Sequence, residues 1–273
     1  MSLLESAAFG LKHYTIRRWN CLFGIPLEAG ENLAQNLNID HLKLLWCLYF
    51  FRRYQPQSVC ASWASVDEKT FNTHVMRSIT KLDQFLPPVS CFYFLYFGLF
   101  AYLYLKLNFE DRWDNWEHLS PSCIADGTPI PILDLRRIPW CDRSRFYSVK
   151  VGGPALQYVF LVHVETGRFL HVSKAYPGGT FEPNIVHKEL DDSLIFGEKI
   201  MADLLFKNDA LFIVSEKEDT PYSRSFDSIR SKIERKIGQV KEWAIANVRF
   251  RSSDFRMHAK IINILCRLIN YLD

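Results

Sequence analysis

The sequence predicts an α/β protein in two parts: an all-helical N-terminal region, then a mixed five-stranded sheet with flanking helices. Two observations carry this prediction. Before residue 86 apolar residues recur at helical spacing, whereas from residue 123 short β-rich runs are bounded by turn residues. A chain of 273 residues is also long enough to bury a core in each part. We expect a helical region at 1–86, a connector at 87–120 and an α/β domain at 121–273.

Composition excludes some classes of protein and leaves others open. Apolar residues make up 48% and charged residues 23% of the chain, which excludes a disordered or fibrous protein. The net charge of +3 says little about partners, but residues 224–260 carry ten Lys and Arg against four Asp and Glu. Such a cluster can neutralise nucleic-acid phosphates, although a solvated helix face gives the same pattern.

The cysteines and the N-terminus both favour an intracellular protein. The seven cysteines are scattered without any CxxC pair, which predicts reduced and mostly buried thiols. The first residues, MSLLESAAFGLKHY, lack the basic and apolar regions of a secretory signal.

An aromatic run at 91–105, CFYFLYFGLFAYLYL, has no charged residue and three interpretations. A membrane span is the least favoured, because a helix needs roughly 20 apolar residues to cross a bilayer and a span would separate the two parts of the chain. A buried helix is the ordinary alternative. The third interpretation is a translated intron: Val89-Ser90 can be encoded by GTAAGT, Lys106 by AAG, and a T-rich intron reads as Phe, Tyr and Leu.

The N-terminal helices predict a helix-turn-helix at about 44–83. An apolar helix is followed by a short helical piece and a turn in which Ser65 and Glu68 have capping-box spacing. The last helix then places four apolar residues on one face, Phe71, Val75, Ile79 and Leu82. In a helix-turn-helix this helix enters the major groove, so Arg77 and Lys81 become candidate DNA contacts. Any three-helix bundle would show the same pattern.

The second part alternates strands and helices in a recognisable order. The expected strands are 123–126, 146–151, 156–164, 168–175, 198–203 and 210–214, with a helix at 181–190, a polar linker at 219–226 and helical structure at 227–272. Antiparallel strands, a helix, further strands and closing helices match the order of an RNase H-like domain.

Three acids occupy positions that this topology brings together. Asp126 ends the first strand, Asp203 ends a later one, and Glu234 lies on the first long helix after the sheet. Carboxylates in such a group can hold two metal ions that activate a water or a 3′-hydroxyl at a phosphodiester. Mg²⁺ prefers oxygen ligands and keeps several waters, so three carboxylates are a sufficient protein contribution.

The helix that carries Glu234 shows two faces. Its apolar stripe is Ile229, Ile233, Ile237 and Val240. Arg230, Glu234 and Lys241 share another face, at offsets of four and seven residues. These charges are either a plain i,i+4 pairing or a metal ligand beside cations that hold DNA phosphates.

Several short motifs follow one another in an order that resembles a known family. They are Asp126-Gly127-Thr128-Pro129-Ile130, Phe146-Tyr147-Ser148-Val149-Lys150, Thr166-Gly167-Arg168, Tyr176-Pro177-Gly178-Gly179, Glu198-Lys199-Ile200-Met201-Ala202-Asp203 and Arg230-x3-Glu234-x6-Lys241. In this order they resemble the DDE domain of PIF/Harbinger-type transposases and their bacterial insertion-sequence relatives. The N-terminal helices resemble the helix-turn-helix that precedes this domain. The likeness covers residues from about 14 to 272, except the aromatic run.

The resemblance implies a metal-dependent DNA endonuclease and strand-transfer protein. Asp126, Asp203 and Glu234 would be its catalytic residues and would bind Mg²⁺ or Mn²⁺. Its expected partners are DNA, as transposon ends or target, a Myb-like protein and further copies of the chain, and in a eukaryote it would act in the nucleus. The DNA contacts would come from Arg77, Lys81, Arg230, Lys241, Arg249 and Arg251.

The sequence also departs from the family pattern around these acids. Leu205 and Phe206 stand where the family has Gly and Tyr after the second aspartate, and Asp227 replaces a Tyr before the arginine. Phe181-Glu182 stands where a His-Asp pair is common, so Glu182 is a secondary metal-ligand candidate. Because supporting groups orient metal ligands, two alternatives stay open. One is a decayed or domesticated transposase that binds DNA or a partner, and the other is a structural protein with a membrane-associated aromatic helix.

Overall fold

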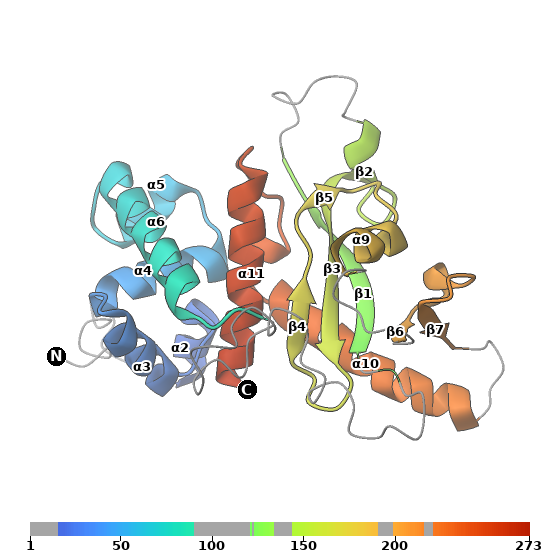
Figure 1. The fold of residues 1–273 in the computed structure, drawn as a ribbon. Helices are drawn as coiled ribbons and strands as arrows, with labels where there is room; N and C mark the ends of the chain where they lie inside the picture. The colour runs from blue at the N-terminus through green and yellow to red at the C-terminus, as the bar shows by residue number, and fades with distance from the viewer. Residues whose placement is uncertain (1–15, 90–120, 122, 134–143, 191–198, 216–220) are drawn as a thin grey trace, which may run out of the picture. The chain divides into compact units, whose positions relative to one another are not determined.

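The computed structural model describes residues 16–89, 121, 123–133, 144–190, 199–215 and 221–273 (Figure 1). The aromatic run at 91–105 lies outside these residues. Contacts divide the chain into two compact units, and each is described by itself. The first comprises the described part of Met1–Leu86 with Lys241–Val248, and the second is built from Pro87–Val240 and Arg249–Tyr271.

The N-terminal unit is helical, as predicted. Its helices are α2 (Ile16–Phe23), α3 (Leu27–Leu37), α4 (His41–Arg53), α5 (Gln57–Trp63) and α6 (Glu68–Phe85). The apolar stripe predicted for α6 is confirmed, since Phe71, Val75, Ile79 and Leu82 are all buried. Helix α6 packs against α4, whose Leu44, Leu45, Cys47 and Leu48 are also in the core.

The start of α6 differs from the prediction. Its N-cap is Asp67, whose side chain accepts hydrogen bonds from the backbone N–H of Thr70 at 2.9 Å and from its hydroxyl at 2.6 Å. Ser65, the predicted capping residue, instead has a positive φ of 56° in the preceding turn. An aspartate directly before the helix satisfies its free N–H groups well, so the capping-box spacing of Ser65 and Glu68 was coincidental.

A short segment from late in the chain completes the N-terminal unit. Trp243, before η4 (Ala244–Ala246), is buried against Gly24, where a Cβ would come within 2.7 Å of its ring. Glu242 pairs with Arg52 of α4 at 3.2 Å, and the Arg52 guanidinium lies 5.7 Å from the centre of the Trp243 ring. Residues 241–248 are therefore part of this helical core.

The second unit is built on a mixed sheet (Figure 1). Its long central strands, β1 (Cys123–Pro131) and β3 (Gly153–His163), are antiparallel over nine residue pairs from Cys123↔His163 to Pro131↔Ala155. On the far side of β3 lie three short strands, β2 (Tyr147–Ser148), β5 (Tyr176–Pro177) and β4 (Phe169–Val172). On the far side of β1, β6 (Ile200–Ala202) and β7 (Phe212–Val214) continue the sheet in parallel. Within the described residues the mixed sheet has seven strands, two more than predicted: β2-β3-β1-β6-β7 lie in this order, and β4 and β5 also pair with β3.

Helices cover both faces of this sheet. One face carries α9 (Glu182–Leu190), and its core contains Cys123, Ala125, Val159, Leu161, Ile185, Val186, Leu190, Ile200, Ala202, Phe206 and Phe212. The other face carries α11 (Phe255–Leu272), whose buried His258 lies 2.6 Å from the hydroxyl of Tyr158. Helix α10 (Pro221–Lys241) adjoins α11, because Lys236 is ion-paired with Asp273.

Three predicted boundaries were wrong, each for a local reason. Strand β1 does not end at Asp126 but runs on to Pro131, because β3 supplies partners along its whole length. The expected strand 146–151 is a 3₁₀ turn, η1 (Ser144–Phe146), then the two residues of β2 and a turn that ends at Gly152, where φ is 66°. The expected linker 219–226 is helical from Pro221, a residue suited to the first turn of a helix.

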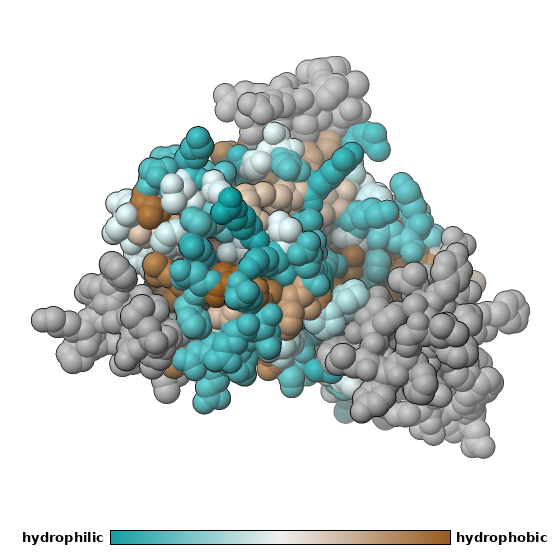
Figure 2. Space-filling model, turned by 60° about the vertical axis from the view of Figure 1, so that its left-hand side comes forward, coloured by the Kyte–Doolittle hydropathy of each residue, from teal (hydrophilic) through white to brown (hydrophobic). Residues whose placement is uncertain are grey.

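The described cysteines fit the prediction of reduced thiols. Cys47, Cys60, Cys123 and Cys266 are buried and unbonded, and only Cys21 is exposed. The face in Figure 2 is largely hydrophilic, with smaller apolar patches between the polar side chains. None of the helices within the described ranges combines the length and the apolar character that a membrane crossing requires.

Candidate active site

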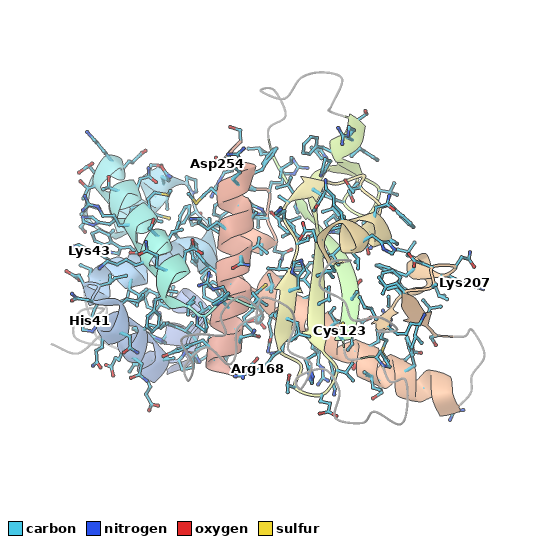
Figure 3. All side chains as sticks on the ribbon, viewed as in Figure 1. His41, Lys43, Cys123, Arg168, Lys207 and Asp254 are labelled. Carbon is cyan, nitrogen blue, oxygen red and sulfur yellow. The ribbon has the colours of Figure 1, made fainter. Side chains whose placement is uncertain are left out.

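Asp126 lies on β1, and Asp203 follows directly after the neighbouring parallel strand β6. The register pairs Cys123 with Ile200 and Ile124 with Met201, and β6 ends at Ala202, one residue before Asp203. Asp126 lies opposite Phe160, two residues from Tyr158, so it is on the face that α11 covers. Figure 3 labels Cys123, at the start of β1, and Lys207, just after η3 (Leu204–Phe206).

Asp126 is a largely buried acid. Burial raises its pKa to about 6, and the nearby charge of Glu182 adds to the rise. The backbone N–H of Gly127, 2.8 Å from Oδ1, acts in the opposite direction, as do the charges of Lys150 and Arg230. Burial is thus the largest cause of the raised pKa of Asp126. Asp203, in contrast, caps η3, and its Oδ1 accepts the N–H of Leu204 at 2.5 Å.

Glu182 lies on the opposite face of the sheet from Asp126. It is the first residue of α9, is 7% exposed, and its Oε1 accepts a hydrogen bond from Gln157 Nε2 at 3.0 Å. Gln157 shares a face with Val159 and Gly127, the α9 face. A Cβ on Gly127 would lie 2.2 Å from the Glu182 carboxyl carbon, so the carboxylate rests on the bare backbone of β1. Glu182 thus acts on Asp126 through the sheet.

Glu234 sits in a more exposed setting on α10. Its side chain is 52% exposed and forms an ion pair with Arg230, 2.9 Å away and one turn earlier. The same Arg230 is the cation that acts on Asp126 from α10. The predicted i,i+4 pairing is therefore present, and it brings the charged face of α10 into electrostatic range of the first aspartate. Of the predicted apolar stripe, Ile233, Ile237 and Val240 are buried and Ile229 is half-buried.

The donor chemistry of this face suits a hard divalent cation. Asp126 and Asp203 offer carboxylate oxygens, the ligands that Mg²⁺ prefers, and burial is the main cause of the raised pKa of Asp126. Within the described ranges, no three His, Cys, Asp or Glu side chains converge closely enough to hold an ion. The catalytic and metal-binding roles of Asp126, Asp203 and Glu234 therefore stay predictions.

The predicted DNA-contact residues fall into two groups. In the N-terminal unit, Arg77 is exposed on α6, but Lys81 Nζ donates to the carbonyl oxygens of Leu37 at 3.3 Å and Asn38 at 2.8 Å, at the end of α3. In the second unit, the exposed residues Arg249 and Arg251 flank the buried Phe250, whose backbone bonds to Pro131 and Leu133 of the strand end. Lys241 is the last residue of α10. Lys81 thus has a structural use as the cap of α3.

Gln157 and Lys150 are two supporting residues that the sequence analysis missed. Gln157 is 3% exposed and holds Glu182 from β3. Lys150, in the turn before β3, reaches the same Glu182 oxygen at 3.2 Å, and its side chain is 54% exposed. A glutamine inside the apolar run Leu156–Val162 was the available signal, because a buried amide needs a partner.

A second glutamate on α9 is bound quite differently. Glu189 accepts hydrogen bonds from the Lys174 N–H at 3.0 Å and the Tyr176 hydroxyl at 2.8 Å, and lies 3.0 Å from His171 Nε2. Burial alone would raise its pKa, but the hydrogen bonds outweigh burial and lower it. The same contact has the opposite effect on Tyr176. Burial, together with the hydrogen bond to Glu189 and its charge, raises the pKa of Tyr176 to about 12.

The residues that depart from the family pattern support the fold. Phe206 is buried in the α9-face core, and its ring centre lies 4.6 Å from that of Phe212. Leu205 is 49% exposed. An aromatic side chain after the second aspartate therefore holds η3 against β7.

Comparison with known proteins gives one family. A family model described as DDE superfamily endonuclease matches residues 125–270, more than half of the chain. The match begins one residue before Asp126 and includes Asp203 and Glu234. Neither the curated proteins nor the solved structures contain a match to this chain.

Proposed function

Because the chain belongs to the DDE superfamily endonucleases, we propose that it cuts DNA as a PIF/Harbinger-type transposase does. At the level of the family, it is a transposase-like nuclease with DNA as its substrate. The feature that supports the proposal best is the place of the two aspartates, Asp126 on β1 and Asp203 directly after the neighbouring parallel strand β6. Asp126 is also largely buried, and burying its charge is unfavourable for folding, which favours a functional use of this residue.

The proposed ligands of Mg²⁺ or Mn²⁺ are Asp126, Asp203 and Glu234. When bound, divalent ions at such carboxylates activate the attacking oxygen and stabilise the leaving oxygen of a phosphodiester. Asp126 contributes a carboxylate in a partly desolvated position, where its charge acts strongly on a cation. Glu182 is not in this set, because it lies on the α9 face.

Cations near the acids would hold the DNA backbone. Arg230 acts on Asp126 and is bonded to Glu234, so it would meet a phosphate that approaches both acids. Lys241, Arg249 and Arg251 are proposed to extend this contact along the strand. In the N-terminal unit, α5 and α6 are proposed as a helix-turn-helix with Arg77 on its exposed side. A Myb-like partner, self-association and, in a eukaryote, nuclear location belong to the same proposal.

Nicking of a supercoiled plasmid tests the proposal. The plasmid carries the genomic DNA that flanks the coding region, and Mn²⁺ or Mg²⁺ is added to the purified full chain. We expect Asp126→Asn, Asp203→Asn and Glu234→Gln each to lower the rate at least about 100-fold, because each removes a ligand. Glu165→Gln is the control, since Glu165 is exposed in the β3–β4 turn. Equal rates for wild type and the three site variants would refute the endonuclease.

The alternative function is DNA or partner binding by a decayed transposase. The observation that favours it is the Arg230–Glu234 ion pair, which neutralises the third acid. Binding to the flanking DNA without nicking, unchanged by Asp126→Asn, would favour this alternative. Loss of binding in Arg77→Ala together with Arg249→Ala would then identify the contact residues.

A further inference from the structure

A group of exposed apolar side chains lies around the turn between β2 and β3. Tyr147, Val149 and Val151 are 52%, 87% and 37% exposed, whereas Ser148 between the first two is buried. Phe181, directly before α9, is 51% exposed. Apolar side chains that gather on an exposed surface often mark an interaction site. We call these four exposed residues the turn surface.

The two segments that carry the turn surface lie against each other (Figure 1). The N–H of Gly179 donates to the carbonyl oxygen of Arg145 at 2.7 Å. Lys150 Nζ lies 3.2 Å from Glu182 Oε1. Phe181 comes between Gly179 and Glu182 in the chain, so it is held beside the turn.

The turn itself is well fixed and open to solvent. The carbonyl oxygen of Ser148 accepts the N–H groups of Gly152 at 2.9 Å and Val151 at 3.3 Å, and Ser148 pairs with Gly153 of β3. In the part of the chain that the structure describes, a Cβ added to Gly152 or Gly153 would meet no atom within 4 Å. A surface that is already fixed loses little conformational entropy when a ligand binds.

The exposed charges beside the turn surface are positive. Arg145 is exposed, and 54% of the Lys150 side chain is exposed. The nearby acid Glu182 is only 7% exposed and is bonded to Lys150 and Gln157. A second copy of the chain would bring like charges together, whereas a nucleic acid would bring phosphates to these cations. The charges therefore favour a nucleic acid as the occupant.

The exposed aromatic rings favour a single strand over a duplex. In a duplex the bases stack on one another, whereas the bases of a single strand offer free faces to aromatic side chains. Tyr147 and Phe181 supply such rings, and Arg145 and Lys150 lie close enough in the chain to meet the adjoining phosphates. This combination of rings and cations is typical of surfaces that bind single strands without regard to sequence.

The turn surface lies on the same sheet as the first aspartate. Tyr147 pairs with Pro154, and the next residue, Ala155, lies opposite Pro131 on β1. Pro131 is five residues beyond Asp126, which corresponds to about 17 Å along the strand. At the B-form spacing of about 3.4 Å this is about five nucleotides. A DNA strand at Asp126 can therefore reach the turn surface within a few nucleotides.

We propose that the turn surface binds unpaired bases of single-stranded DNA, which stack on Tyr147 and Phe181 while Arg145 and Lys150 hold the adjoining phosphates. The inference rests on the proposed function, since it takes DNA as the partner. It adds the form of the DNA and the part of the sheet that receives it. Binding here requires neither a metal ion nor cleavage.

Fluorescence anisotropy of a short labelled oligothymidine, with the full chain, tests the proposal. EDTA prevents cleavage, and excess unlabelled duplex occupies the sites that bind duplex DNA. Tyr147→Leu and Phe181→Leu keep an apolar side chain but remove the ring, so each should weaken binding at least about fivefold. Tyr147→Trp keeps a ring that can stack and should bind at least as tightly as wild type.

The cations have a separate measurement. Arg145→Met should reduce the slope of log K against log salt concentration by about 0.7, because one phosphate contact is lost. Matched controls are Lys188→Met and Tyr271→Leu. Lys188 lies over the Tyr176 ring, and Tyr271 is partly exposed near the end of α11. Both controls should bind oligothymidine like wild type.

An oligonucleotide without bases separates stacking from charge. It should bind more weakly than oligothymidine and equally to wild type and Tyr147→Leu. Equal binding of oligothymidine by wild type and both leucine variants would refute the proposal. A shift from dimer to monomer in sedimentation, without loss of oligothymidine binding, would identify the turn surface as a contact between copies and would also refute it.

Failure of the proposed function gives a different result. A wild-type chain that nicks no plasmid but binds oligothymidine through Tyr147 and Phe181 refutes the endonuclease and confirms the turn surface. A chain that nicks through Asp126 but binds oligothymidine without any dependence on the two rings confirms the endonuclease and refutes the turn surface.

Discussion

Helix α9 carries a glutamate near each end, and their surroundings treat them in opposite ways. Glu189 is met by a hydroxyl, a backbone N–H and an imidazole, and its pKa is lowered. Glu182 receives one amide and one exposed ammonium, and its charge raises the pKa of the aspartate behind it. The comparison separates an acid that stabilises the fold from one whose charge remains available to act on a neighbouring site.

Removing the charge of Glu189 should have the largest effect on stability. Glu189→Gln leaves three donors competing for one amide oxygen, so we expect the free energy of unfolding to fall by about 2–3 kcal/mol. Glu182→Gln should cost less than about 1 kcal/mol, because it also removes a repulsion with Asp126. Urea unfolding at neutral pH measures both, and equal losses would abolish the distinction between the two ends.

Acid pH should change the contributions of Asp126 and Glu189 to stability in opposite directions, because the pKa of Asp126 is raised and that of Glu189 is lowered. The pKa of Asp126 is higher in the folded than in the unfolded chain. The ionised carboxylate therefore lowers the free energy of unfolding above pH 6, and this loss disappears as the pH falls towards 4. Without divalent cations, Asp126→Asn should therefore stabilise the chain by about 2 kcal/mol above pH 6 and by almost nothing below pH 4.

The folded pKa of Glu189 is lowered, so its stabilising contribution is present above its unfolded pKa and is lost as the pH falls. The difference in stability between wild type and Glu189→Gln should consequently shrink in acid. Urea unfolding across pH 4–8 follows both variants. A stability gain for Asp126→Asn that does not depend on pH would contradict the burial of its charge.

A smaller effect should come from closing the gap between Glu182 and β1. Gly127→Ala places a methyl group 2.2 Å from the Glu182 carboxyl carbon, and we expect a loss of about 1–2 kcal/mol as the carboxylate moves. In a Glu182→Ala background the three atoms nearest to the new methyl group are gone, so the same substitution should cost much less. A double-mutant cycle by urea unfolding measures the coupling, and additive losses would show that Gly127 matters for another reason.

The smallest effect on stability should be at Glu234. Its ion pair with Arg230 is half-exposed and one turn apart, so Glu234→Gln should lower the free energy of unfolding by less than about 0.5 kcal/mol. A thermal unfolding scan provides the measurement. A large loss of stability would mean that Glu234, like Glu189, stabilises the fold. A loss of nicking by Glu234→Gln could then be explained by unfolding and not by a lost metal ligand.

Asp126 and Asp203 could be predicted as candidate site residues because their sequence signals are local. Each follows a short apolar run, and a turn signal comes after Asp126. The same turn residues concealed the full length of β1: Gly127, Thr128 and Pro129 ordinarily end a strand, but the antiparallel ladder with β3 carries the strand through them. Tertiary pairing thus overrode the local preference, as is common for strands.

The supporting network could not be read in the same way. Gln157, Lys150 and Glu182 come from β3, a turn and α9, and only the fold brings them to Gly127. No spacing along the chain connects them. The face on which Glu182 lies is also invisible in the sequence, because it depends on how α9 packs across the sheet.

Trp243 has a consequence for how the chain is made. It fills the slot over Gly24, yet it is synthesised more than 150 residues later, on the order of ten seconds or more at ribosomal rates. During that interval the first helices lack the Trp243 side chain that packs against Gly24. A fragment that ended at residue 86 would lack this contact permanently. The helical unit therefore completes its core only after strands β1 to β7 have been translated, and before α11 is.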